Sequence, residues 1–203
     1  MDEPVAILIL AAGASSRMRG ADKLLQPVGG RPLLAERAAA ALATGAPVIL
    51  ALPPRDMAPD RWRAVEGLGV TCLAVEDAGT GMAASLRAGV RALSEGVAGV
   101  LILLADMPEI TTADLVALIE RADGTHILRG SGADGTPGHP VLFPARDFAA
   151  LARVTGDAGA RDLLKQERDR VRSVTLPGAH ALTDLDTPED WARWRAARAS
   201  GDQ

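Results

Sequence analysis

Three basic residues gather in a short segment near the beginning of the chain. The apolar run Val5–Ala11 is followed by small residues and then by Arg17, Arg19 and Lys23. Small residues let backbone N–H groups approach an anion closely, and the three cations add positive charge to a chain whose formal net charge is −4. The segment is therefore predicted to bind a polyphosphate. From composition alone, a strand-to-helix turn with solvated basic residues explains it equally well.

Two common phosphate-binding loops do not fit this segment. A dinucleotide-binding loop has the pattern G-x-G-x-x-G, whereas Gly13 is followed by Ala-Ser-Ser-Arg. A P-loop requires a Gly-Lys pair, and the sequence contains none. These absences count against an NAD-dependent oxidoreductase and against a P-loop NTPase.

Asp106 is the first candidate for a metal ligand. It follows the most apolar run, Gly99–Leu104, and precedes Pro108. Ligands in open parallel sheets bind outside the carboxyl ends of the strands, and Mg²⁺ needs only one or two carboxylates besides substrate phosphates. The alternative role, capping the next helix, is already filled by Thr111, so we favour a metal contact.

A second acidic pair precedes the last predicted helix. Asp184 and Asp186 alternate around Leu185, so only one of them can face a ligand if the segment is extended. Capping of the helix that begins at Thr187-Pro188 is an equally good role for either carboxylate.

The elements that would position these residues alternate between strand and helix. Buried strands are predicted at Val5–Ala11, Pro47–Leu52, Val70–Val75 and Gly99–Leu104, with helices at Leu33–Ala43, from Met82 to Leu93 and from Leu115 to Ala122. Met82 is expected to fill the core. This alternation predicts an α/β fold: a mostly parallel Rossmann-like sheet with helices on both faces, in three α/β/α layers.

The second half of the chain has a looser pattern. Short strands are expected at His126–Arg129 and Val141–Phe143, with a glycine-rich loop at Gly130–Pro140 between them, and an edge or antiparallel strand at Arg170–Leu176. No linker interrupts the sequence, so we expect one domain over residues 1–199, with a frayed tail at 200–203.

Composition excludes several classes of protein. The 203 residues include one cysteine, Cys72, which cannot form an intramolecular disulfide. The acidic balance and the five aromatic residues argue against nucleic-acid binding. No apolar run is long enough to cross a membrane, and the acidic start of the chain is unlike a signal peptide. A cytoplasmic location is therefore expected.

Several motifs together carry a resemblance to a known family. The first loop, LAAGASSRMRGADKLL, is similar to the signature of small-molecule nucleotidyltransferases with a Rossmann-like sheet, and it most resembles the molybdenum cofactor cytidylyltransferases. Other matching stretches follow in order: Gly81–Gly89, Leu103–Thr111, Gly138–Phe143, Gly156–Leu164 and Thr183–Asp190. The chain departs from the family in having one extra residue between Arg17 and Lys23, which we identify as Arg19.

The resemblance implies a reaction and a set of roles. It implies Mg²⁺-dependent transfer of CMP from CTP to the phosphate of molybdopterin, with a molybdoenzyme as a further partner. Residues 1–110 would bind the nucleotide and residues 111–199 the acceptor. The catalytic residues would be Lys23, Asp106 and Arg17, and the metal ligands Asp106 and Asp186. The nucleotide would contact Leu10, Ala11, Ala12, Gly13, Lys23, Gly81 and Ser85, and the acceptor His139 and Arg161.

Alternatives remain open at this point. Ala12 favours CTP, because guanylyl relatives typically have Gly there, but a guanylyltransferase or another nucleotidyltransferase of the same superfamily is the second interpretation. A non-catalytic chaperone that carries molybdenum cofactor is the third. In either enzyme the acceptor phosphate attacks directly, so no protein nucleophile is needed and catalysis rests on positioning and charge.

Overall fold

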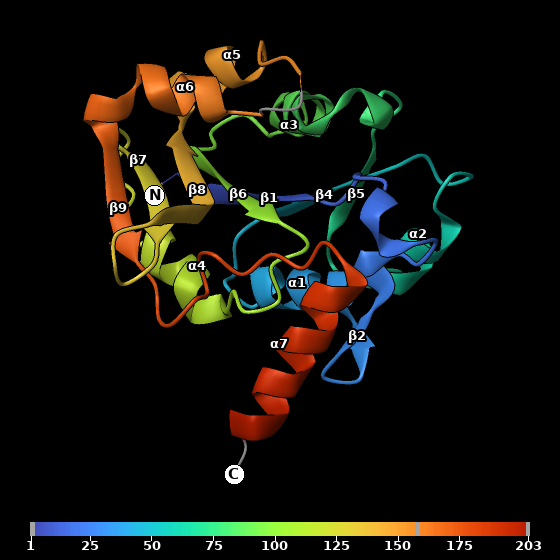
Figure 1. The fold of residues 1–203 in the computed structure, drawn as a ribbon. Helices are drawn as coiled ribbons and strands as arrows, with labels where there is room; N and C mark the ends of the chain where they lie inside the picture. Colours follow the sequence, from blue (N-terminus) through green and yellow to red (C-terminus); the bar gives the residue numbers. More distant parts are fainter. Residues whose placement is uncertain (1–2, 157–158, 202–203) are drawn as a thin grey trace.

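Four apolar runs form the parallel half of a seven-stranded sheet in the computed structural model, which describes residues 3–156 and 159–201. The strands β5 (Thr71–Ala74), β4 (Val48–Leu52), β1 (Val5–Leu10) and β6 (Gly99–Leu104) lie side by side in that order, and each neighbouring pair is parallel. All residues of β1 and β4 are buried, as expected for strands covered on both faces. The loop after β1 therefore emerges near the middle of the sheet (Figure 1).

Three further strands extend the sheet beyond β6. β8 (Pro137–Pro144) is antiparallel to β6, β7 (Ile127–Ser131) is antiparallel to β8, and β9 (Val171–Thr175) is parallel to β7 at the edge. The edge position of β9 is as predicted, whereas the antiparallel option is wrong. The predicted glycine-rich loop at 130–140 is also mostly wrong, because β7 and β8 extend into it and leave only 132–136 as a connection.

Helices cover both faces of the sheet, which confirms the predicted α/β/α layers (Figure 1). One face carries α1 (Leu33–Leu42), α2 (Pro59–Ala64), α4 (Thr112–Ile119) and α7 (Pro188–Gly201). The other carries α3 (Met82–Arg91), α5 (Phe148–Leu151) and α6 (Arg161–Gln166). A two-stranded ribbon, β2 (Pro27–Val28) with β3 (Arg31–Pro32), precedes α1. Short 3₁₀ turns are η1 (Ser16–Met18), η2 (Lys23–Leu25), η3 (Ala78–Thr80), η4 (Ala145–Asp147) and η5 (Arg168–Arg170).

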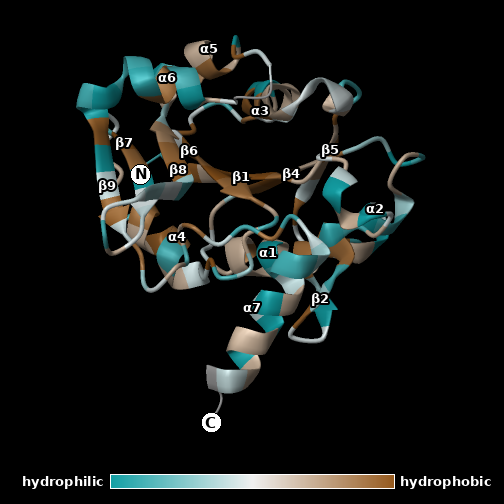
Figure 2. Cartoon of the chain, in the orientation of Figure 1, coloured by the Kyte–Doolittle hydropathy of each residue, from teal (hydrophilic) through white to brown (hydrophobic). Residues whose placement is uncertain are grey.

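Alternate residues of each central strand feed two separate cores. Ile7 packs in the cluster on the α1 face and Leu8 in the cluster on the α3 face. Figure 2 shows hydrophobic central strands between helices that carry both hydrophilic and hydrophobic residues. Trp191 and Trp194 anchor α7 in the first cluster, and their rings make an edge-to-face contact of 5.8 Å between centroids.

Helix ends follow the predicted chemistry, with two corrections. Thr111 caps α4 and Asp114 completes the capping box. α7 begins at Pro188 after Thr187, but it continues to Gly201 and thus into the segment expected to fray. Met82 is 41% exposed and is not part of the core. Two parts of the predicted segments lie outside the described residues: 157–158 of the matching stretch Gly156–Leu164, and 202–203 of the predicted tail. Within the described chain, no helix is long and apolar enough to cross a membrane.

Candidate active site

Four predicted residues come together at the carboxyl edge of the sheet. The ammonium group of Lys23 lies between two carboxylates, 2.5 Å from Oδ2 of Asp106 and 2.7 Å from Oδ1 of Asp186. The guanidinium of Arg17 lies 2.7 Å from the other oxygen of Asp186. Lys23 is well shielded from solvent, whereas Arg17 is largely exposed. The structure thus joins residues from three distant parts of the sequence into one charged cluster.

The position of Asp106 is fixed by backbone contacts on both sides. Ala105 donates a hydrogen bond to the carbonyl of Leu10, and the carbonyl of Asp106 accepts one from Leu185. Arg37, a buried arginine of α1, donates to the carbonyls of Met107 and Ile110 just after it. The turn that carries Asp106 is therefore held from β1, from the segment before α7 and from α1.

The capping box of α7 holds Asp186. The side chain of Asp190 accepts hydrogen bonds from the backbone N–H groups of Asp186 (3.3 Å) and Thr187 (2.9 Å), and the hydroxyl of Thr187 accepts one from Asp190. Asp190 and Thr187 form the cap of α7, so the Asp186 carboxylate is not needed for capping. It is instead paired with Lys23 and Arg17.

Asp184 is a third carboxylate beside this pair. Partial burial raises its pKa, and the negative charges of Asp186 and Asp106 raise it further. Burial lowers the pKa of Lys23, but the two carboxylates outweigh that effect and the net shift is upward. The edge of the sheet is thus a region where negative charge accumulates and where a cation is favoured.

One oxygen of Asp106 is available for a metal ion. Its Oδ1 atom is buried and makes no hydrogen bond to the described residues. Within the same residues no group of three His, Cys, Asp or Glu side chains could hold a metal on its own. That combination fits Mg²⁺, which typically takes one or two protein carboxylates and completes its shell with phosphates and water.

Part of the predicted nucleotide-binding backbone is already used within the protein. The carbonyl of Leu10 and both backbone groups of Ala11 are hydrogen-bonded to other parts of the chain. Ala12 and Gly13, in contrast, make no backbone hydrogen bond to any described residue. A Cβ atom added to Gly13 would meet nothing within 4 Å. Open space next to unpaired backbone is what close approach of a ligand requires, and Ala12 and Gly13 are the residues of this stretch that offer unpaired backbone.

The remaining nucleotide-side residues lie at the start of α3. Gly81 precedes the helix with φ of +108°, a conformation that favours glycine, and Ser85 is buried one turn into the helix. Arg19, the residue expected to be extra, has φ of +52° and pairs with Glu189 of α7 at 2.5 Å. Arg19 therefore contributes to the attachment of α7 and not to the Lys23 cluster.

The two predicted acceptor residues line a common hollow on the α3 face of the sheet. His139 comes from β8 and Arg161 from the start of α6. Burial, followed by the charge of Arg129, lowers the pKa of His139 to about 4, so its ring is neutral near pH 7. A neutral ring with such a low pKa is a weak base, which agrees with a reaction that needs no strong base.

Arg61 is a residue that sequence reasoning missed. It lies in α2, its side chain is 3% exposed, and it donates to the carbonyl of Ala11 (2.6 Å), to Ser15 (3.0 Å) and to both oxygens of Asp22 (2.6 and 3.0 Å). Asp22 in turn caps the short helix that begins at Lys23. A single buried guanidinium thus ties together both ends of the loop, and nothing in its local sequence distinguishes it from the exposed Arg63.

Comparison with known proteins identifies the family. The model of the MobA-like NTP transferase domain matches residues 7–171, and the chain belongs to this family. The purine catabolism protein PucB of Bacillus subtilis is 29% identical over 97% of this chain and 99% of its own length. The bifunctional protein GlmU of Novosphingobium aromaticivorans is 31% identical over 83% of this chain, which spans about a third of that longer protein.

Solved structures agree with this assignment. Rv0371c from Mycobacterium tuberculosis is 31% identical and superimposes with a TM-score of 0.83 over 96% of this chain and 98% of its own. A structure of Rv0371c in complex with manganese is 30% identical, with a TM-score of 0.78 over 94% of this chain and 97% of its own. A nucleotidyl transferase from Methanothermobacter, 23% identical with a TM-score of 0.81 over 96% and 97%, has the same fold. The chain is a nucleotidyltransferase.

Proposed function

We propose that the chain transfers CMP from CTP to the phosphate of molybdopterin and releases pyrophosphate. The observation that carries the proposal is the position of Lys23 between Asp106 and Asp186, at the end of the loop that follows β1. Such a cluster can neutralise a triphosphate without supplying a nucleophile. Membership in a nucleotidyltransferase family supports the same reaction class.

The residues divide the work of the reaction between them. Lys23 and Arg17 exchange their carboxylate partners for phosphate oxygens of the nucleotide, and the free backbone of Ala12 and Gly13 lies against it. An oxygen of the acceptor phosphate forms a bond to the α-phosphorus, and the bond from that phosphorus to the β-phosphate oxygen breaks. The protein contributes alignment and charge stabilisation, which together can supply most of the rate enhancement of such a transfer.

A divalent cation fits the carboxylates of the same site. Asp106, through its unpaired Oδ1, and Asp186 are the residues that would hold Mg²⁺. When bound, Mg²⁺ would neutralise phosphate charge and polarise the α-phosphorus. The manganese in the structure of Rv0371c supports the use of a divalent ion in the family.

The choice of substrates rests on the motifs of the chain. Ala12 supports CTP, and the order of the motifs through Thr183–Asp190 supports molybdopterin as the acceptor. The product would then pass to a molybdoenzyme. A cytoplasmic location is part of the proposal, supported by the single cysteine, Cys72, which leaves the chain without an internal disulfide.

A panel of nucleotides tests the proposal directly. The purified chain is incubated with Mg²⁺, molybdopterin and one of CTP, GTP, ATP or UTP, and pyrophosphate release is measured. Of the four nucleotides, only CTP should support rapid release of pyrophosphate. Asp106→Asn should abolish this release. Asp56→Asn is the control, because Asp56 is an exposed carboxylate distant in sequence, and it should leave the release unchanged. Release with GTP and not with CTP would show that the nucleotide is assigned wrongly. No release with any nucleotide would refute molybdopterin as the acceptor.

A further inference from the structure

A hollow of about 880 Å³ lies on one face of the sheet and extends from β1 to the edge strand β9. Its floor includes apolar side chains from four strands of the sheet: Leu10 of β1, Ile102 of β6, Phe143 of β8 and Val171 of the edge strand β9. Such a floor accommodates the flat or hydrocarbon part of a ligand rather than a chain of phosphates. The hollow begins at the strand whose end carries the nucleotide loop and continues to the far edge of the sheet.

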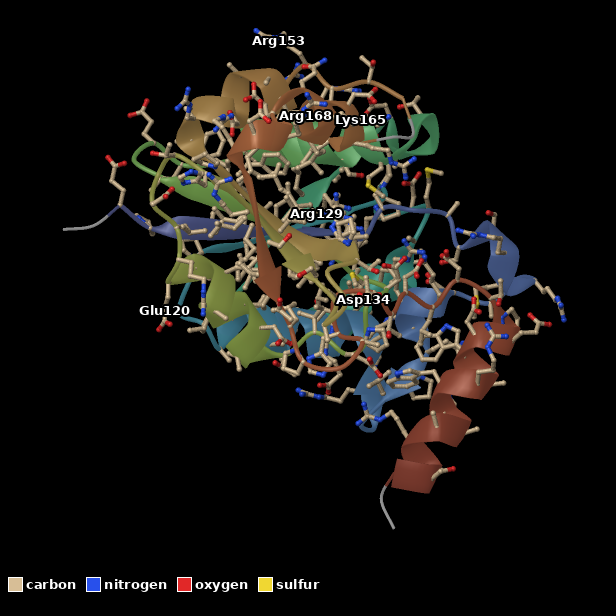
Figure 3. All side chains as sticks on the ribbon, turned by 60° about the vertical axis from the view of Figure 1, so that its left-hand side comes forward. Glu120, Arg129, Asp134, Arg153, Lys165 and Arg168 are labelled. Atoms are coloured by element: carbon tan, nitrogen blue, oxygen red, sulfur yellow. The ribbon has the colours of Figure 1, made fainter. Side chains whose placement is uncertain are left out.

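The wall above this floor is strongly basic. Arg161, Lys165 and Arg168 follow one another at steps of four and three residues, which places them on one side of α6 and the turn after it. All three line the hollow, and Arg129 of β7 joins them from the sheet. In Figure 3 Lys165 and Arg168 are seen at α6 and Arg129 below that helix, whereas Arg153 lies at the outer margin.

The described residues that line the hollow include no Asp or Glu. Arg129 is held by the carbonyl of Gly138 at 2.9 Å, and its pKa is lowered by burial and by the nearby charge of Arg161. Lys165 and Arg168 have only neighbouring exposed carboxylates, at 3.5 and 3.7 Å, and such pairs contribute little. In addition, Nδ1 of His139 is buried in the lining without a hydrogen-bond partner among these residues. The lining of the hollow is thus positively charged, and a bound anion would neutralise that charge.

This positive charge is not placed for the reacting phosphate. Asp106 lies two residues after the end of β6, and Arg129 lies on β7, with β8 between the two strands. Neighbouring strands are about 4.8 Å apart, so the two strands are separated by about 10 Å. The members of the Lys23 cluster, Arg17, Lys23, Asp106 and Asp186, are not among the residues that line the hollow, so the basic wall is a separate group of cations. The basic wall therefore requires an anionic group of its own.

We propose that the acceptor carries a second anionic group besides its attacking phosphate, and that Arg129, Arg161, Lys165 and Arg168 bind that group. This inference rests on the proposed function and narrows the class of acceptor. A neutral body attached to a single phosphate would bring no anion to these four cations of the hollow. Within molybdopterin, the two dithiolene sulfurs are the groups besides the phosphate that carry negative charge when they are ionised.

Binding of a truncated acceptor separates the basic wall from the reaction centre. Molybdopterin freed of its phosphate is titrated into the purified chain without CTP or Mg²⁺, and binding is followed by pterin fluorescence. Wild-type protein should bind it, and Arg129→Gln/Arg161→Gln should bind at least about ten-fold more weakly, as loss of a charge-assisted hydrogen bond predicts. Arg153→Gln, an exposed arginine outside the hollow, is the matched control and should stay within about two-fold.

Turnover adds a second readout. In the double variant the KM for molybdopterin should rise at least about ten-fold while the KM for CTP stays within about two-fold. If the double variant does not fold, Lys165→Gln/Arg168→Gln, whose side chains are exposed, should shift the same constants in the same direction.

Two results would overturn the inference. One is wild-type protein that fails to bind the truncated acceptor, or double variants that bind it equally well. The other is a KM for CTP that rises in parallel with that for the acceptor, because the cations would then serve the triphosphate. If wild-type protein forms no CMP-containing product but binds the truncated acceptor through Arg129 and Arg161, the proposed function fails while the inference about the anionic group stands.

Discussion

Replacement of Arg61 by Met should damage catalysis more than it damages the fold. The Arg61 side chain is 3% exposed, so its loss removes a buried charge pair with Asp22 and hydrogen bonds to Ala11 and Ser15. Breaking a buried pair typically costs 3–5 kcal/mol, but the Asp22 side chain is 25% exposed and can regain water. We therefore expect about 3 kcal/mol of lost stability, equivalent to a fall in Tm of about 6–12 °C.

The catalytic effect follows from the position of Lys23 on the same loop. Without Arg61, the two ends of the loop lose their common anchor, and a displacement of the Lys23 ammonium by about 1 Å can cost about 100-fold in rate. We expect kcat/KM for CTP to fall by about that factor at a temperature where the variant remains folded. Arg61→Lys, which keeps the charge but cannot reach all three partners, should give an intermediate value.

Steady-state kinetics and urea unfolding on the same samples provide the assay. Arg63→Met is the matched control: Arg63 lies in the same helix, is largely exposed and pairs only with Asp60, so both its activity and its stability should be near wild type. The reasoning is refuted if folded Arg61→Met protein keeps kcat/KM within about three-fold of wild type. A loss of activity that only follows the unfolded fraction would also refute a positioning role.

Three more outcomes follow from the geometry of single residues. Gly13→Ala should change the free energy of unfolding by less than about 1 kcal/mol, because the added Cβ meets open space. The same variant should raise the KM for CTP at least about ten-fold, and an unchanged KM would argue against contact between Gly13 and the nucleotide. Gly138→Ala should lose more than about 2 kcal/mol in urea unfolding, because its Cβ would lie 1.9 Å from the carbonyl oxygen of Ala181, and wild-type stability would contradict this contact. Folding lowers the pKa of His139 from 6.5 to about 4, so the unfolded chain binds a proton at His139 more readily than the folded chain does. The contribution of His139 to stability is therefore present above pH 6.5 and declines by up to about 3 kcal/mol as the pH falls to 4. In a pH series of unfolding curves, His139→Gln should lack this part of the decline.

Periodicity and caps account for what the sequence predicted well. The run Gly99–Leu104 is the strand β6 with the same bounds, and Thr111 caps α4 as expected. Both follow from local chemistry, since a strand covered on two faces needs continuous apolar residues and a helix start needs a side-chain acceptor. Polyphosphate binding by the loop after β1 could be predicted from equally local information, since its cations and small residues are close together in the sequence, and it stays a prediction.

Long-range contacts account for the failures. Gly130 and Gly138 suggested a loop, but they lie in strands, where an added Cβ would approach the carbonyl oxygens of His139 and Ala181 to 2.6 and 1.9 Å. A glycine required by close backbone approach cannot be distinguished in one sequence from a glycine required by a turn. The role of Arg61 could not be predicted from its neighbours in the sequence, because all its partners belong to the distant loop after β1.

Mass spectrometry of the reaction product tests the central claim most directly. The chain is incubated with CTP, Mg²⁺ and molybdopterin, and the pterin fraction is analysed before and after. The account predicts a species heavier than molybdopterin by one CMP residue, formed in step with pyrophosphate and lost in Asp106→Asn. Recovery of unmodified molybdopterin alone, with CTP intact, would contradict it.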